Sequence, residues 1–328
     1  MRIALLGAGF TRNWGGWLAS ELVGELCGRV EGDVELLQRL KERRNFEQVL
    51  EEIRQEASYG SKQQLRFERL QQAVLATFDE MNQMLARQVF EVGFPSHPDR
   101  WLVHFLAEFD AIFTLNQDLF LEMHYVPGKT VEDRRKWRAT TYPGIALPLN
   151  WSEGVPSERL GPVLSESGTL EHDPRDQPIY KLHGSVNWRN ADGSRILVFG
   201  SGKDAIIEES SLLSGYLEAF RKCLSAGETK VMVVGYSFAD DHVNDLLREA
   251  SMLNGLQTYL VNPAGLSVFD PPSNPLITQS KRVLGALKLT GILTRPFRDA
   301  FISDDLAFSS FQRFLHGTGN RISSSYSK

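Results

Sequence analysis

Five polar turns in this sequence follow apolar, β-rich segments, and their side chains could carry chemistry. In the motif IYKLHGSVNW, His183 follows such a segment and precedes Gly184. A histidine at the end of a strand, beside a small residue, is accessible, and its ordinary pKa of about 6.5 suits a general base. A structural histidine whose ring is satisfied inside the protein is the alternative interpretation.

A second turn, in the motif FTLNQDLFLE, pairs an amide with a carboxylate. Asn116 and Asp118 come at the end of the apolar segment 111–115. Two side chains at this spacing can face one polar ligand, and ligands of open α/β sheets lie at the carboxyl ends of the strands. An Asx turn that closes the strand is the alternative.

A third turn is rich in glycine. Gly7-Ala8-Gly9 follows the apolar segment 2–6, and glycines let the backbone turn tightly and approach a pyrophosphate at a helix start. The full GxGxxG fingerprint is missing because Arg12 stands at the third glycine position, and no acidic strand end follows. A hydride-transfer dehydrogenase is therefore disfavoured, and a purely structural turn stays the alternative.

The last two turns lie in VMVVGYSFADDHVNDLL and TYLVNP. Gly235 and Ser237 offer a close backbone approach and a hydroxyl, and Asn262 offers an amide at the end of the next strand. Asp241 and His242 open the helix that follows the first of these turns, where helix capping is their expected role.

The elements that must position these turns alternate between strands and helices. Strands are predicted at 2–6, 111–115, 179–182, 196–199, 231–235 and 258–261, and helices at 14–26, 212–220 and 243–250. This alternation predicts an α/β fold with a Rossmann-like, mostly parallel sheet flanked by helices. In such a sheet the five turns converge on one crevice.

Residues 33–100 differ in character from the rest, being charged and poor in strand signals. Phe46, Val49, Leu50 and Ile53 follow a helical repeat, and Asn45 begins a capping pattern. We predict a helical insertion at 33–100 within a Rossmann domain formed by 1–32 and 101–312, followed by a disordered tail at 313–328. The charged face of the insertion is expected to be solvated, with a partner surface as the alternative.

Composition excludes several classes of function. The 36 Lys and Arg residues against 41 Asp and Glu residues give a net charge of −5, which argues against broad binding to nucleic acid or to an anionic membrane. Cys27 and Cys223 are isolated, so no zinc module is expected. Without a signal-peptide pattern or a long apolar run, the sequence predicts a reduced cytoplasmic protein with no membrane span.

The order GAG-F-T, T-x-N-x-D, H-G, G-x-S and V-N-P resembles the sirtuin superfamily, whose segments read approximately GAGxS, TQNxD, HG, GTS and a late Asn. The GYSFxDxH variant and the helical insertion are more similar to the bacterial sirtuin-like enzymes of antiphage defence, which hydrolyse NAD⁺ rather than deacylating proteins. Leu115 replaces the glutamine of TQNxD, and the zinc ribbon of the deacylases is absent from the sequence.

The resemblance implies a role for each turn. The cofactor-binding residues that it implies around the pyrophosphate are Gly7, Ala8, Gly9, Phe10 and Thr11. Asn116 and Asp118 would face the nicotinamide ribose and carboxamide, and His183 would be the catalytic base. Gly235 and Ser237 would border the dinucleotide, and Asn262 would meet the adenosine ribose.

The activity implied is cleavage of NAD⁺, as substrate and without a metal, to nicotinamide and ADP-ribose. The resemblance also implies an NAD-depleting effector of antiphage defence by abortive infection. Activation is expected through a homo-oligomer or through a partner ATPase or other phage-sensing protein, with 33–100 as the assembly surface and any nucleic acid sensed only through that partner. An NAD-dependent protein deacylase and a non-catalytic NAD or ADP-ribose sensor are the alternatives.

Overall fold

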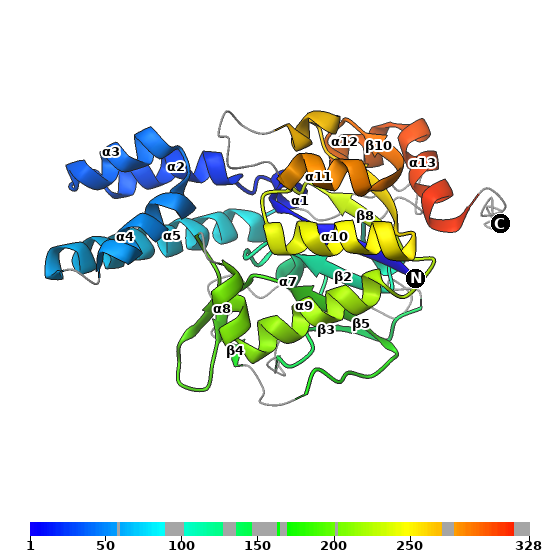
Figure 1. The fold of residues 1–328 in the computed structure, drawn as a ribbon, viewed down its shortest axis with the longest axis horizontal. Coiled ribbons are helices and arrows are strands. Elements are labelled where there is room, and N and C mark those ends of the chain that lie inside the picture. Colours follow the sequence, from blue (N-terminus) through cyan, green and yellow to red (C-terminus); the bar gives the residue numbers. More distant parts are fainter. Residues whose placement is uncertain are drawn as a thin grey trace.

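The fold is built on a seven-stranded sheet in the order β10-β9-β8-β1-β2-β5-β3, in which all neighbouring strands are parallel (Figure 1). The computed structural model describes residues 1–57, 60–88, 102–126, 136–145, 163–164, 169–200, 203–270 and 279–317. The strands are β1 (Arg2–Leu6), β2 (Ala111–Thr114), β3 (Ala139–Thr141), β5 (Asp176–Lys181), β8 (Lys230–Val234), β9 (Gln257–Val261) and β10 (Lys288–Leu293). This arrangement confirms the predicted Rossmann-like α/β fold.

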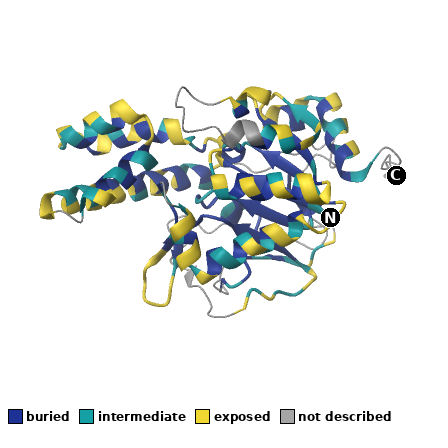
Figure 2. Ribbon diagram, viewed as in Figure 1, coloured by how far each residue is buried: buried dark blue, intermediate teal, exposed yellow. Residues whose placement is uncertain are grey.

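The central strands are buried on both faces, which is why they read as continuous apolar runs (Figure 2). Helices α9 (Ser211–Leu224), α10 (Asp241–Asn254) and α11 (Gln279–Ala286) lie over one face (Figure 1). Aromatic side chains join this layer to the sheet, since Phe220 of α9 packs against Phe113 of β2.

A second group of helices consists of α6 (Leu102–Ala107), α12 (Phe297–Ser303) and α13 (Asp305–His316). Their aromatic side chains form one cluster, in which Phe105, Phe297, Phe301 and Phe311 contact one another. Helix α13 continues to His316, so the predicted start of a disordered tail at 313 is wrong. The helix extends this far because Phe314 and Leu315 are buried, and residues 318–328 lie outside the described residues.

A second, three-stranded sheet consists of β4 (Val163–Leu164), β6 (Gly184–Arg189) and β7 (Arg195–Leu197). The strand predicted at 196–199 therefore belongs to this small sheet. Strand β6, which the sequence analysis missed, follows β5 after only two residues. It pairs with β7 in antiparallel orientation.

Helices α2 (Ala19–Arg29), α3 (Val34–Arg43), α4 (Phe46–Ala57) and α5 (Ser61–Ala86) form a helical arm that projects from the sheet (Figure 1). The predicted helix start is confirmed, because Oδ1 of Asn45 accepts hydrogen bonds from the backbone N–H groups of Glu47 and Gln48 at 3.0 and 3.2 Å. Helix α2 packs against the other three, so the arm begins at α2 and not at residue 33.

The helix predicted at 14–26 is wrong at its start. The chain forms a short α1 (Ala8–Arg12), and Gly15, with a φ of +94°, interrupts it before α2. Trp14 lies in this break and is buried, with its ring centroid 5.2 Å from that of Phe10. The apolar spacing that suggested a helix thus reflects burial of a turn.

The remaining described helices are α7 (Phe120–His124), α8 (Lys203–Glu209) and the 3₁₀ helix η3 (Gly265–Phe269). Among the residues that the structure describes, no helix combines the length and the apolar character that are needed to cross a bilayer.

Candidate functional site

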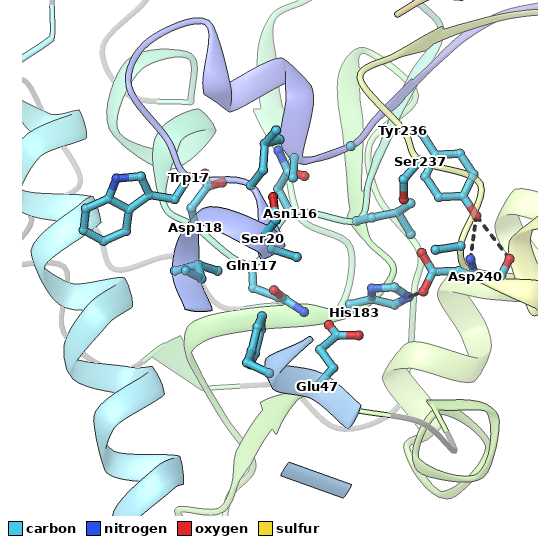
Figure 3. A pocket seen from close by; sticks show the side chains of 18 of the residues that line it. Trp17, Ser20, Glu47, Asn116, Gln117, Asp118, His183, Tyr236, Ser237 and Asp240 are labelled. Atoms are coloured by element: carbon cyan, nitrogen blue, oxygen red, sulfur yellow. Dashed lines mark hydrogen bonds and ion pairs between the residues drawn. The ribbon is translucent and has the colours of Figure 1, made fainter. Parts of the chain in front are cut away.

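A cavity of about 490 Å³ lies at the carboxyl ends of the central strands (Figure 3). The strand order reverses at β1, which has β2 on one side and β8 on the other. Ligands of open α/β sheets bind at such a switch point, and the volume is typical of ligand pockets. Seven predicted site residues line the cavity: Gly7, Ala8, Asn116, Asp118, His183, Gly235 and Ser237.

The turns after β1 and β8 interlock. The N–H of Gly7 donates to the carbonyl of Val234, and the N–H of Gly9 donates to the carbonyl of Gly235, both at 2.9 Å. A Cβ on Gly235, whose φ is +66°, would lie 2.4 Å from the carbonyl carbon of Gly9. The glycines therefore form the tight structural turn that was the alternative interpretation. Their N–H groups already bind backbone carbonyls, so they are not free to bind a pyrophosphate.

Asn116 and Asp118 are held together by Thr11. The Nδ2 group of Asn116 donates to Oγ1 of Thr11 at 2.8 Å, and the Thr11 hydroxyl hydrogen-bonds to the Asp118 carboxyl group. Burial raises the pKa of Asp118, although Lys181 and the N–H of Phe120 oppose the shift. The bond to Thr11 uses one of the two Nδ2 hydrogens, so Oδ1 is left to accept a hydrogen bond from a ligand and the second Nδ2 hydrogen is left to donate one.

A buried lysine holds the turn that carries Asn116 and Asp118. Lys181, which is 1% exposed, donates to the carbonyl of Asp118 at 2.5 Å, to Oε1 of Glu122 at 2.6 Å and to Oγ of Ser185 at 2.8 Å. A buried ion pair with several hydrogen bonds holds its geometry firmly. The sequence analysis missed this group, for which the only signal is a lysine inside an apolar strand.

The candidate base, His183, lies in the wall of the cavity and is 2% exposed. Burial lowers the pKa of His183 to about 3, and the nearby Lys203 and His242 also lower it, while Asp240 opposes the shift. The Nε2 atom lies 3.1 Å from Nε2 of His242 and 3.9 Å from Oδ1 of Asp240. The imidazole is therefore neutral at physiological pH, with a lone pair on one of its two ring nitrogens.

A charge cluster beside His183 joins three distant segments through Lys203, and Figure 3 labels its two acidic members, Glu47 and Asp240. Nζ of Lys203 lies 2.8 Å from Oδ1 of Asp240 and 2.9 Å from Oε2 of Glu47. Burial favours the neutral form of Asp240, but His183, Lys203 and His242 oppose this effect and hold its pKa at about 2. Burial raises the pKa of Glu47 despite the nearby lysine. Asp240 thus provides a fixed negative charge near the imidazole.

Sequence analysis missed this cluster. Asp240 occupies the N-cap position of α10, but its side chain makes no capping hydrogen bond. It binds Lys203 instead. Neither Lys203 nor Glu47 follows an apolar strand, so the strand-end signal that revealed the other residues could not reveal these two.

Four predicted site residues do not line the cavity, namely Gly9, Phe10, Thr11 and Asn262. Phe10 is buried among Trp14, Phe120 and Phe297. The Asn262 amide donates to the carbonyl of Tyr236 at 3.1 Å and accepts from the N–H of Ala264 at 2.9 Å. These residues support the turns that form the cavity wall.

The helical arm lines part of the cavity. The start of α2, helix α4 and helix α5 all contribute side chains to the cavity wall. Together with the residues next to these helices, they supply Trp17, Leu18, Ala19, Ser20, Arg44, Phe46, Phe78 and Met81. Within the described residues, no cluster of three or more His, Cys, Asp or Glu side chains could hold a metal ion.

A family model described as a SIR2-like domain matches residues 110–283, which is more than half of the chain. The chain belongs to the SIR2-like domain family. SIR2-like domains use NAD⁺, so the family is consistent with an NAD-utilising enzyme. The SIR2-like match includes Asn116, Asp118 and His183 but begins after the glycine turn and the arm. A comparison with curated proteins found no match.

Proposed function

We propose that this SIR2-like protein is an NAD⁺ glycohydrolase that releases nicotinamide and ADP-ribose. The observation that carries the proposal is the position of a buried, neutral His183 in the same cavity as Asn116 and Asp118. A base, an amide oxygen and a carboxyl group at one switch point match what cleavage of a glycosidic bond by water requires.

In the proposed reaction, water attacks C1′ of the nicotinamide ribose, and the bond to the pyridinium nitrogen breaks. The bonding electrons leave with nicotinamide, which departs as a neutral molecule, and His183 accepts the proton that water loses. Oδ1 of Asn116 accepts a hydrogen bond from the ribose or the water, and Asp118 orients the carboxamide. Base catalysis of this kind contributes about 10²–10⁴-fold to the rate.

The start of α2 is the favourable place for the pyrophosphate. Leu18, Ala19 and Ser20 line the cavity at this helix N-terminus, where the helix dipole favours an anion. Arg44 also lines the cavity and supplies a positive charge. Gly7 and Ala8 would then contact the dinucleotide through the surface of their turn.

We further propose that the enzyme is an NAD-depleting effector of antiphage defence that assembly activates, through a homo-oligomer or through a partner ATPase or other phage-sensing protein. The arm supports this idea, because it projects from the sheet and also forms part of the cavity wall (Figure 1). A change at its outer surface can therefore reach the site through α4. Light-scattering mass and nicotinamide release should change together when exposed arm residues such as Val34 and Leu65 become Asp.

The test of the activity is chromatography of NAD⁺ incubated with the purified protein, alone and with a candidate partner ATPase. We expect nicotinamide and ADP-ribose in equal amounts, at least 10²-fold less with His183→Gln, and a clear loss with Asn116→Ala. His172→Gln, outside the cavity wall, is the matched control. Full activity in both site variants would contradict the assignment. Loss of an acyl group from a lysine peptide in step with nicotinamide would indicate a deacylase, and binding without products would indicate a sensor.

A further inference from the structure

His183 and His242 face each other through the same ring atom. Their Nε2 atoms are 3.1 Å apart, and the ring planes are inclined by 57°. His183 ends the link after β5, and His242 lies in the first turn of α10. A close contact between two ring nitrogens requires one to donate a proton and the other to accept it.

His183, His242 and Asp204 form a row of three side chains in contact. The position of Asp204 determines which of the two rings donates its N–H in the contact between them. Oδ1 of Asp204 lies 3.0 Å from Nδ1 of His242, and a carboxylate accepts the N–H there. A neutral His242 then has a lone pair on Nε2. Nε2 of His183 therefore carries the hydrogen in the N···N contact, and Nδ1 of His183 keeps the lone pair that can take a proton from the cavity.

We propose that His242 and Asp204 form a proton-transfer path that carries the proton from His183 to solvent. This proposal rests on the proposed hydrolysis. As water attacks C1′, Nδ1 of His183 takes its proton, and the Nε2 proton of His183 moves to Nε2 of His242. The Nδ1 proton of His242 moves to Asp204, which releases it to bulk water. One proton enters and one leaves, so no charge stays in the interior. Both rings end in the opposite tautomers and return to the starting ones by proton exchange with solvent before the next turnover.

The exposure of the three side chains follows the direction of this path. His183 is 2% exposed, His242 is 8% exposed and Asp204 is 65% exposed. A proton held on His183 is costly, because burial disfavours the charged ring. Passing it outward removes that cost, which a purely structural contact between two neutral rings would not do.

Other charged groups face the row from three elements. Asp240 and Asp241 lie at the start of α10, Lys203 begins α8, and Glu47 of α4 binds Lys203. Lys203 disfavours a proton on either ring, whereas Asp240 favours one. Lys203 is held in ion pairs with Asp240 and Glu47, and Asp204 is the exposed carboxylate that contacts His242, so Asp204 is the end at which the proton can leave.

The experiment compares His242→Gln and His242→Ala with wild-type protein and the control His172→Gln. Glutamine can keep a hydrogen bond to His183 but cannot relay a proton. We expect kcat for nicotinamide release to fall about 10²-fold in both variants, with KM changed less than about threefold. Added imidazole should raise kcat of the His242→Ala variant at least about tenfold and should leave kcat of His242→Gln unchanged. An active His242→Gln, or failure of imidazole to rescue, would overturn the relay.

A second readout needs no turnover. Nitrogen NMR of histidine-labelled protein should show the hydrogen on Nε2 of His183 and on Nδ1 of His242 at pH 7.5, and the opposite tautomers would overturn the relay. Wild-type protein that releases no nicotinamide under any condition would overturn the hydrolase proposal together with the relay. Hydrolysis by wild type with normal turnover in His242→Gln would overturn the relay alone.

Discussion

The side-chain amide of Asn116 donates a hydrogen bond to Oγ1 of Thr11 at 2.8 Å and so joins the ends of β2 and β1. The threonine hydroxyl continues this chain to the Asp118 carboxyl group. One buried hydroxyl thereby orients both polar groups that the proposed reaction uses. Thr11, which the resemblance assigned to the pyrophosphate, does not line the cavity and contacts Asn116 instead.

Thr11→Val should impair turnover more than folding. The change keeps the shape of the side chain but removes the acceptor of the Asn116 amide, and a hydrogen bond of this kind contributes about 1 kcal/mol. We expect kcat for nicotinamide release to fall roughly five- to tenfold. Thr11→Ser keeps the hydroxyl and is the control. Equal rates for the valine and serine variants would show that this hydrogen bond does not orient the site.

Gly235→Ala should destabilise the protein and abolish binding of the dinucleotide. Its Cβ would lie 2.4 Å from the backbone of Gly9, and its φ of +66° is unfavourable for alanine. We expect a loss of at least about 2 kcal/mol in the free energy of unfolding, measured with urea. Gly24→Ala is the matched control, because nothing lies within 4 Å of its Cβ and it lies inside α2. A Gly235→Ala protein as stable as the control would contradict the interlocked turns.

Lys203→Met should move the pH profile of the reaction. The positive charge of Lys203 lowers the pKa of His183 and of His242, so its removal raises both pKa values. The base is active when neutral, and we therefore expect the acidic limb of kcat/KM to move to higher pH. Lys222→Met, at an exposed lysine of α9, is the control. An acidic limb that stays in place, or moves to lower pH, would show that the cluster does not influence the base.

Lys181→Met should destabilise the protein far more than the double variant in which its partner Glu122 is replaced as well. Removing the lysine leaves Glu122 buried without its cation, which costs about 3–5 kcal/mol in the free energy of unfolding. The double variant Lys181→Met with Glu122→Leu removes both charges and should recover most of the loss. Arg221→Met, at an exposed ion pair with Glu249, should change stability little. Urea unfolding that ranks the single and double variants equally would contradict the buried pair.

Local sequence patterns were sufficient to predict the strands that hold the site. β8 is apolar and buried from Val231 to Val234, as expected for a strand in the interior of a parallel sheet, and five of the six predicted strands belong to that sheet. Parallel strands bring their carboxyl ends to one edge, which is why Asn116 and His183 could be expected to meet. Local patterns failed at Trp14, where burial of a turn imitated the spacing of a helix.

The sequence by itself determined the layered fold and the edge of the sheet where the polar turns gather, because strand burial and strand direction leave local patterns. Only the tertiary structure decided that Gly7 and Gly9 use their N–H groups internally and that Lys203 joins Glu47 to Asp240 beside His183. Contacts between segments remote in the chain follow no periodicity. Their energy depends on burial and on distances of a few ångströms, which arise only when the chain is folded.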